Sequence, residues 1–215
     1  MNADWAAENL QTIRTLMERS ALYRRALAPI MLTIGCIGLG AAVLGYKLEI
    51  FHPSHFLLFW LVTAVIACGT AFFLVRRQSI VLKEPIWTPP ARQVVLAALP
   101  ALVAGLVLGL AMMADTHVKD KNTQGAEKYL AHALQPHLWL VLYGCALHSA
   151  GRLMQRGIRL LGWVFIASGC GLFVVTGLGI PYAWYGYAVM GMFFGLLQQA
   201  YGLYLYLTEK KDTAA

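Results

Sequence analysis

Two histidines, a glutamine and a proline stand close together in an otherwise apolar stretch. His132, Gln135, Pro136 and His137 lie in the first half of Tyr129–Ala150. Imidazoles can ligate a metal or a haem iron, and proline has no N–H to donate to the carbonyl of His132. The pattern predicts a kinked helix with a free backbone acceptor. It makes His132, Gln135 and His137 candidate ligand-binding residues, with histidines that bond only to neighbouring backbone or water as the alternative.

Two glutamines, Gln198 and Gln199, lie in the last apolar stretch of the chain, ahead of several tyrosines. Amide side chains inside a membrane helix usually hydrogen-bond to a neighbouring helix. They also suit the polar lining of a site for a quinone-like or lipid ligand. Both glutamines are therefore candidate ligand-binding residues, with helix–helix hydrogen bonding as the alternative.

Motifs of catalysis are missing from the sequence. It contains no H-E-x-x-H, no G-x-S-x-G, no phosphate-binding glycine loop and no paired intramembrane carboxylates. The cysteines lie in apolar stretches without a C-x-x-C pair, which favours packing over metal binding. We therefore expect no enzyme activity, no catalytic residues, no cofactor and no metal site. The cysteines are Cys36, Cys68, Cys145 and Cys170.

Six apolar stretches must position these side chains. The chain has 215 residues, of which 59% are hydrophobic and 13% charged, far from the balance of a soluble domain. Each stretch is long enough to cross about 30 Å of hydrocarbon as a helix. The sequence predicts an all-α membrane protein, a six-transmembrane-helix bundle. The stretches are Ala26–Tyr46, His55–Val75, Gln93–Met113, Tyr129–Ala150, Leu160–Leu178 and Ala183–Leu207.

The net charge of +7 is distributed unevenly between the two sides of such a bundle. With the N-terminus in the cytoplasm, 13 of the 17 Lys and Arg residues fall on the cytoplasmic side. The positive-inside rule then predicts that both termini are cytoplasmic. No groove-reading motif accompanies the charge, so we expect no nucleic-acid partner. The absence of a signal-peptide or transit-peptide pattern favours a bacterial inner (plasma) membrane.

The segment before the first stretch predicts an amphipathic helix over residues 1–25. Apolar residues share one side of that helix, while basic residues lie mostly elsewhere. Such a helix can lie on the inner leaflet and attract anionic lipids, or dock on its own protein. The domain order is then this helix, a transmembrane domain over 26–207 and a cytoplasmic tail over 208–215. The candidate membrane-surface residues are Arg14, Arg19, Arg24 and Arg25.

Small residues recur at four-residue spacing in the apolar stretches. Gly105 and Gly109 form one G-x-x-x-G pair, and Gly191 and Gly195 form another. Small residues at this spacing let helix backbones approach closely. We predict that these four glycines pack helices together within the bundle, with a homodimer or a larger membrane complex as the alternative.

The chain also resembles a set of uncharacterised bacterial multi-pass membrane proteins. The resemblance lies in "NLQTIRTLMERSALYRRALAP", "EPIWTPPARQV" and "YGCALHSAGRLMQRGIRLLGW". It implies a six-span membrane architecture with an N-terminal NLxxIRxLMERxxxYR-like segment. It implies no activity, substrate or cofactor.

Three functions remain open on the sequence. The first is a structural or accessory subunit, or a module that binds lipids or other apolar ligands. The second is a small-solute transporter, because the two halves of the chain show a faint 3+3 similarity that would place inverted repeats in the membrane. The third is a haem- or metal-binding redox subunit. A polar cavity at mid-depth would favour transport.

Overall fold

The computed structural model describes residues 27–82, 87, 89–119, 126–154, 156–178 and 184–212. Within them the protein is helical and contains no strand. The predicted N-terminal helix, with Arg14, Arg19, Arg24 and Arg25, lies outside the described residues. The helices are Leu27–Lys47, α2 (Pro53–Leu82), α3 (Pro89–Lys119), α4 (Ala126–Ala150), α5 (Arg156–Leu178), α6 (Tyr185–Met190), the π-helix η1 (Gly191–Leu197) and α7 (Gln198–Asp212).

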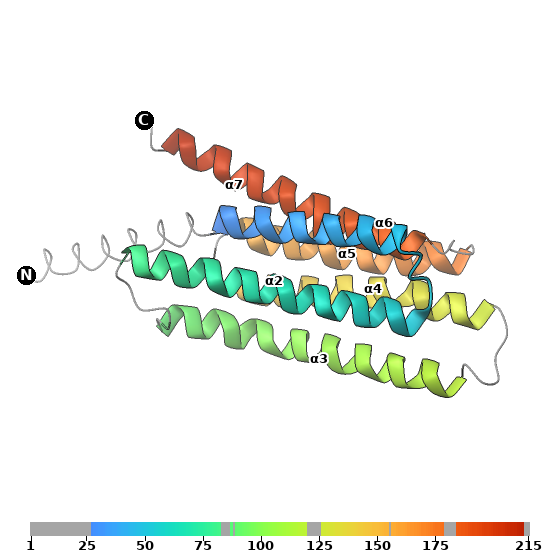
Figure 1. The fold of residues 1–215 in the computed structure, drawn as a ribbon. Helices are drawn as coiled ribbons and strands as arrows, with labels where there is room; N and C mark the ends of the chain where they lie inside the picture. Colours follow the sequence, from blue (N-terminus) through green and yellow to red (C-terminus); the bar gives the residue numbers. More distant parts are fainter. Residues whose placement is uncertain are drawn as a thin grey trace, which may run out of the picture.

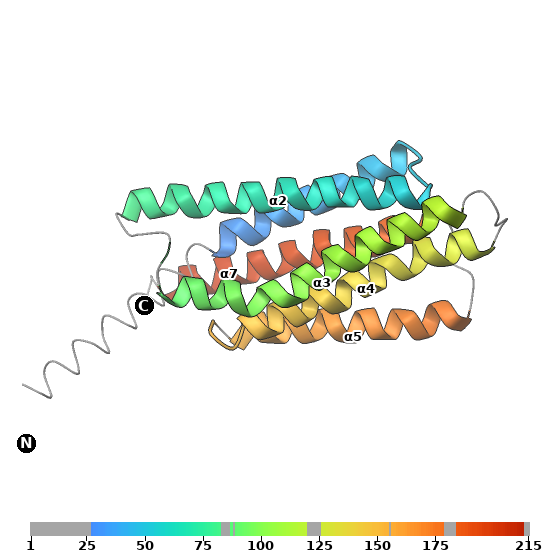
Figure 2. The same ribbon diagram turned by 90° about the horizontal axis from the view of Figure 1, so that it is seen from below.

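These helices form one bundle of long, roughly parallel rods (Figures 1 and 2). The last rod consists of α6, η1 and α7, which follow one another without a break. Successive rods run in opposite directions, so the described chain begins and ends at the same end of the bundle (Figure 1). Each predicted apolar stretch coincides with one rod, apart from a few residues at its ends.

Five rods are long and apolar enough to cross a membrane, as expected for a multi-pass membrane protein. The exception among the described rods is α4, which has 25 residues but carries Gln135, Pro136, His137 and His148. The first three of these side chains are almost completely buried. The polar residues that lower the hydropathy of α4 therefore face protein, where membrane helices tolerate them best.

Glycines bring α4 and α5 into backbone contact. A Cβ atom on Gly162 of α5 would lie 2.6 Å from the backbone nitrogen of His148. One on Gly144 of α4 would lie 2.8 Å from the carbonyl oxygen of Gly162, and one on Gly169 would lie 2.9 Å from that of His137. No larger residue fits at these positions without displacing a backbone. Small residues thus allow the close approach of this helix pair.

The first rod, Leu27–Lys47, packs in the same way against the last rod. A Cβ atom on Gly35 would lie 2.9 Å from the carbonyl oxygen of Gly195, and one on Gly195 would lie 3.0 Å from the Cα of Leu39. The predicted packing residue Gly191 also faces this rod, because its Cβ would lie 2.8 Å from that of Ala42. Small residues therefore allow the first and the last rod to pack closely together.

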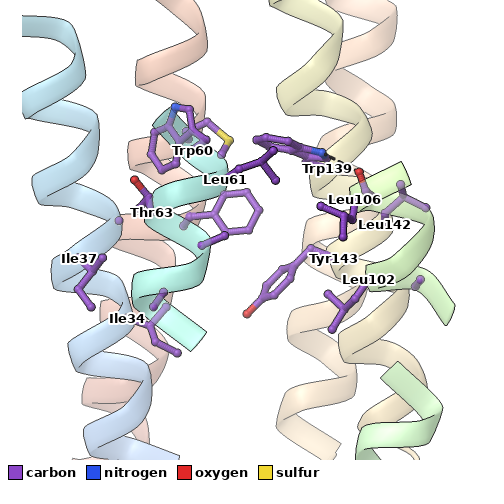
Figure 3. Close-up of a pocket in the computed structure, with 17 residues that line it drawn as sticks. Ile34, Ile37, Trp60, Leu61, Thr63, Leu102, Leu106, Trp139, Leu142 and Tyr143 are labelled. Atoms are coloured by element: carbon purple, nitrogen blue, oxygen red, sulfur yellow. Dashed lines mark hydrogen bonds between the residues drawn. The ribbon is translucent and has the colours of Figure 1, made fainter. Parts of the chain in front are cut away.

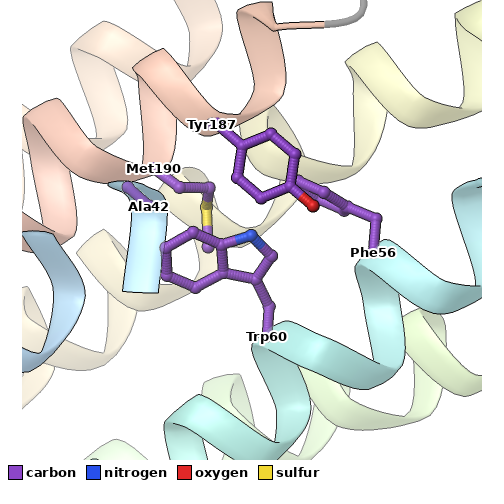
Figure 4. Packing of buried hydrophobic residues seen from close by; sticks show 5 residues of the cluster. All are labelled: Ala42, Phe56, Trp60, Tyr187 and Met190. Atoms are coloured by element: carbon purple, nitrogen blue, oxygen red, sulfur yellow. The ribbon is translucent and has the colours of Figure 1, made fainter. Parts of the chain in front are cut away.

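One end of α2 is fixed by a buried cluster of large side chains. Phe56 and Trp60 of α2 pack against Tyr187 and Met190 of α6, with Ala42 of the first rod alongside (Figure 4). The Tyr187 hydroxyl donates a hydrogen bond to the carbonyl oxygen of Ile50 at 2.7 Å. Elsewhere α2 is mostly uncovered by other helices. Only 6% of the residues in its most apolar 18-residue stretch are buried, against 39% in the last rod. The helix is therefore anchored at one end and loosely packed along the rest.

Candidate functional site

A cavity of about 240 Å³ lies where α2 separates from α3 and α4. Figure 3 shows α2 and the first rod on one side of it and α3 and α4 on the other. Its lining is almost entirely hydrocarbon. The lining residues are Ile34, Ile37, Gly38, Trp60, Leu61, Thr63, Ala64, Ala67, Ala101, Leu102, Gly105, Leu106, Trp139, Leu142, Tyr143, Met190 and Phe194.

The cavity exists because small residues face it from several helices at once. On α2 these residues are Thr63, Ala64 and Ala67, and on α3 they are Ala101 and Gly105. Small side chains leave the space open only if the helices are kept apart. Aromatic residues at its wall, which include the tryptophans of α2 and α4, supply the bulk that separates them.

The cavity lies near the middle of the rods and opens towards the outside of the bundle. Its lining includes residues 34–38 of the rod Leu27–Lys47 and residues 101–106 of α3. Leu102 and Leu106 line the cavity and are also 48% and 47% exposed, so they form its rim. In a bilayer, this opening between α2 and α3 would face lipid.

Most polar groups at the cavity wall already have partners within the protein. The Thr63 hydroxyl donates to the carbonyl oxygen of Phe59 at 2.9 Å, one turn earlier in α2. The Trp139 indole nitrogen donates to the carbonyl oxygen of Gly105 at 3.2 Å and so links α4 to α3. These two bonds leave the lining with little polar character.

The Trp60 indole nitrogen has no partner among the described residues, and the Tyr143 hydroxyl has one but points into the cavity (Figure 3). The hydroxyl oxygen accepts a hydrogen bond of 2.8 Å from Nε2 of Gln198. Gln198 is completely buried, and its Oε1 has no hydrogen-bond partner among the described residues. In this bond the phenol oxygen is the acceptor, so the bond does not use the hydrogen of the Tyr143 hydroxyl.

The predicted site around His137 is separate from this cavity. His137 is fully buried, and its Nε2 shares a hydrogen bond of 3.2 Å with the Tyr185 hydroxyl. Its ring also packs edge-on against Phe173 of α5. Gln135, two residues earlier in the sequence, is also buried. Its Nε2 has no hydrogen-bond partner among the described residues. His132 lies in α4, but its side chain is outside the described part of the chain.

The two predicted glutamines of the last rod point to different places. Gln198 supports Tyr143, as described above, whereas Nε2 of Gln199 lies 3.8 Å from the sulfur of Cys36 in the first rod. Each glutamine therefore bonds to another helix. Among the described residues, no three His, Cys, Asp or Glu side chains come together as a metal site would require.

The glycine pair of α3 faces side chains of α4, and Gly105 also lines the cavity. A Cβ atom on Gly105 would meet only the Leu142 side chain, at 3.7 Å, which is an ordinary contact. One on Gly109 would lie 3.3 Å from Cζ2 of Trp139. The indole ring of Trp139 thus packs against Gly109 and donates its hydrogen bond to Gly105. The contact between α3 and α4 here is thus between backbone and side chain.

Sequence reasoning missed the residues that define the cavity. Trp60, Trp139 and Tyr143 belong to ordinary apolar stretches and form no motif. Trp139 and Tyr143 are four residues apart, which places them on one face of α4. That spacing is the one available signal, and it is shared by many packed helices. The π-helical turn η1, which supplies Phe194 to the wall, has no sequence signature either, although such turns often accompany functional sites.

Comparison with known families, with curated proteins and with solved structures gives no match for this chain.

Proposed function

We propose that this protein binds an apolar molecule taken up laterally from the bilayer. The observation that carries the proposal is the cavity of about 240 Å³, lined almost wholly by hydrocarbon and open between α2 and α3. Binding sites for small molecules are concave, mainly apolar and equipped with few polar groups. This cavity fits that description, with Tyr143 as its polar group.

The alternatives suggested by the sequence receive less support. A purely structural subunit has no use for a cavity between its helices, since close packing is the normal state of a protein interior. A transport pathway for a polar solute requires polar or charged side chains at membrane depth. The lining has no charged side chain, and its polar side chains are few. The apolar lining therefore favours binding of a lipid-soluble molecule without catalysis.

The proposal is tested by filling the cavity. Ala101→Phe places a ring among the lining residues, whereas Ala111→Phe adds the same ring to an exposed position on the same helix. Native mass spectrometry should show one decylbenzene molecule bound to the wild type and to Ala111→Phe, and none bound to Ala101→Phe. Equal binding by all three proteins would show that decylbenzene merely coats the surface, and the proposal would fail.

We also propose the membrane arrangement that this function requires. All six rods, α4 included, cross a bacterial inner membrane, with both termini in the cytoplasm. The arginine distribution supports this orientation. A single cysteine at Asn122, introduced into a cysteine-free background, should react with a membrane-impermeant maleimide from outside the cell. Labelling only after the membrane is opened would overturn the orientation.

A further inference from the structure

The chemistry of the ligand follows from which hydrogen-bond donors point into the cavity. Among the described lining residues, Thr63 and Trp139 donate to backbone carbonyls. The nitrogen of Trp60 has no hydrogen-bond partner among the described residues, and it lies on the side of its ring that faces Tyr187 (Figure 4). The Tyr143 hydroxyl points into the cavity and accepts from Gln198, so its own O–H is the donor best placed for a bound molecule. A matching ligand carries a hydrogen-bond acceptor.

The depth of the cavity decides what kind of acceptor can reach Tyr143. This residue lies five residues past the midpoint of α4, about 7.5 Å along the helix axis, and the hydrocarbon core is about 30 Å thick. The ester groups of a phospholipid are therefore about 15 Å from the midplane. A phospholipid would bring only its acyl chain to this level. An acceptor at this depth belongs to a molecule that has no charged headgroup.

The shape of the wall favours a planar ring. Trp60, Trp139, Tyr143 and Phe194 approach the space from α2, α4 and η1, and aromatic faces and edges pack well against a conjugated ring. An apolar cavity of about 150 Å³ binds benzene. The volume of about 240 Å³ is thus sufficient for one substituted ring. An attached alkyl tail can leave through the opening between α2 and α3.

Building on the proposed function, we propose that the cavity binds the ring of a quinone-class molecule. Tyr143 donates a hydrogen bond to a ring carbonyl oxygen, and Gln198 orients the phenol. The apolar tail extends between α2 and α3 into the lipid. Tyr143 and Gln198 are then the residues that distinguish a carbonyl-bearing ring from a plain hydrocarbon of the same size.

The test compares three probes on the full-length protein in nanodiscs: a decyl-substituted benzoquinone, decylbenzene and methyl laurate. Tyr143→Phe should weaken benzoquinone binding roughly tenfold, the usual effect of losing one hydrogen bond to a buried acceptor. Decylbenzene binding should be unchanged, which also shows that the variant is folded. Tyr206→Phe, an exposed tyrosine of α7 outside the cavity, should behave as wild type. Gln198→Met should weaken benzoquinone binding by a smaller factor.

The probes separate this inference from the proposed function. If Tyr143→Phe leaves benzoquinone binding unchanged while Ala101→Phe still blocks decylbenzene, the quinone assignment fails and apolar binding stands. If methyl laurate binds as tightly as the benzoquinone and with the same dependence on Tyr143, the ring is not recognised and the assignment also fails. If wild type binds none of the three, both proposals fall.

Discussion

Along the α4–α5 interface, glycines lie directly against the facing backbone, whereas the glycines of α3 face side chains across a looser contact. A Cβ atom on Gly162 would be 2.6 Å from a backbone nitrogen, but one on Gly105 would be 3.7 Å from a leucine side chain. Both regions are rich in small residues. The two regions differ in which atoms of the neighbouring helix face the glycines: backbone atoms in one, side chains in the other.

This contrast shows that small residues permit a close approach of helices but do not impose it. Opposite Gly162 stands another glycine, Gly144, so the two backbones meet. Opposite Gly109 lies the indole ring of Trp139, which also donates to the carbonyl oxygen of Gly105. A single large aromatic residue thus turns a packing motif into the wall of a cavity.

The largest expected effect is at the α4–α5 interface. Gly162→Leu should destabilise the bundle by about 3 kcal/mol or more, since its side chain must displace a helix backbone. Thermal unfolding in detergent, followed by size-exclusion chromatography, measures the loss. Gly171→Leu is the matched control on the same helix, because nothing lies within 4 Å of a Cβ atom there. Equal stability of the two variants would contradict the close packing.

The next test compares two glycines that the sequence alone treats as equivalent. Gly195→Ala should cost about 1–3 kcal/mol because its Cβ would press on the backbone of Leu39. Gly105→Ala should instead stabilise the protein by about 0.5–1 kcal/mol, through reduced backbone entropy of the unfolded chain. Thermal midpoints in the same detergent should move in opposite directions. A decrease in both would remove the distinction between packed and open regions.

The sequence predicts the helices well, because their positions depend on local composition. Each apolar stretch coincides with a helix, and the polar residues of α4 mark it as the rod that differs from its neighbours. The G-x-x-x-G pattern likewise marks Gly191 and Gly195 as helix-packing residues, but it does not identify the first rod as the helix that they contact. These features need only the spacing of residues along one helix.

The cavity could not be predicted, because it depends on which helices face one another. Tyr143 and Gln198 are 55 residues apart, and nothing in their local sequence connects them. The sequence does indicate that Gln198 needs a hydrogen-bond partner on another helix. A polar group on any of the other rods could be that partner. The pairs of G-x-x-x-G residues look alike in the sequence and differ only in their neighbours.

A smaller effect is expected where a polar pair lies within the dense region. Tyr185→Phe removes the partner of His137 Nε2 and should cost about 1–2 kcal/mol, since a buried imidazole nitrogen loses its hydrogen bond. In a His137→Leu background, the same substitution should cost almost nothing. A double-mutant cycle of thermal stabilities measures the coupling. Additive losses would show that the two side chains do not depend on each other.

The smallest effect is expected at the cavity wall, from the hydrogen bond between Trp139 and Gly105. Trp139→Phe removes the indole N–H and should cost about 0.6 kcal/mol for that bond, the average for polar contacts between membrane helices. Phe also lacks the ring atom that lies against Gly109, so Gly109→Ala should be better tolerated in the Trp139→Phe protein than in the wild type. Thermal midpoints of the two single variants and the double variant measure both effects. A loss from Trp139→Phe as large as that from Gly162→Leu would mean that α3 is held to α4 as tightly as α5 is, and the cavity wall could not be the looser of the two regions.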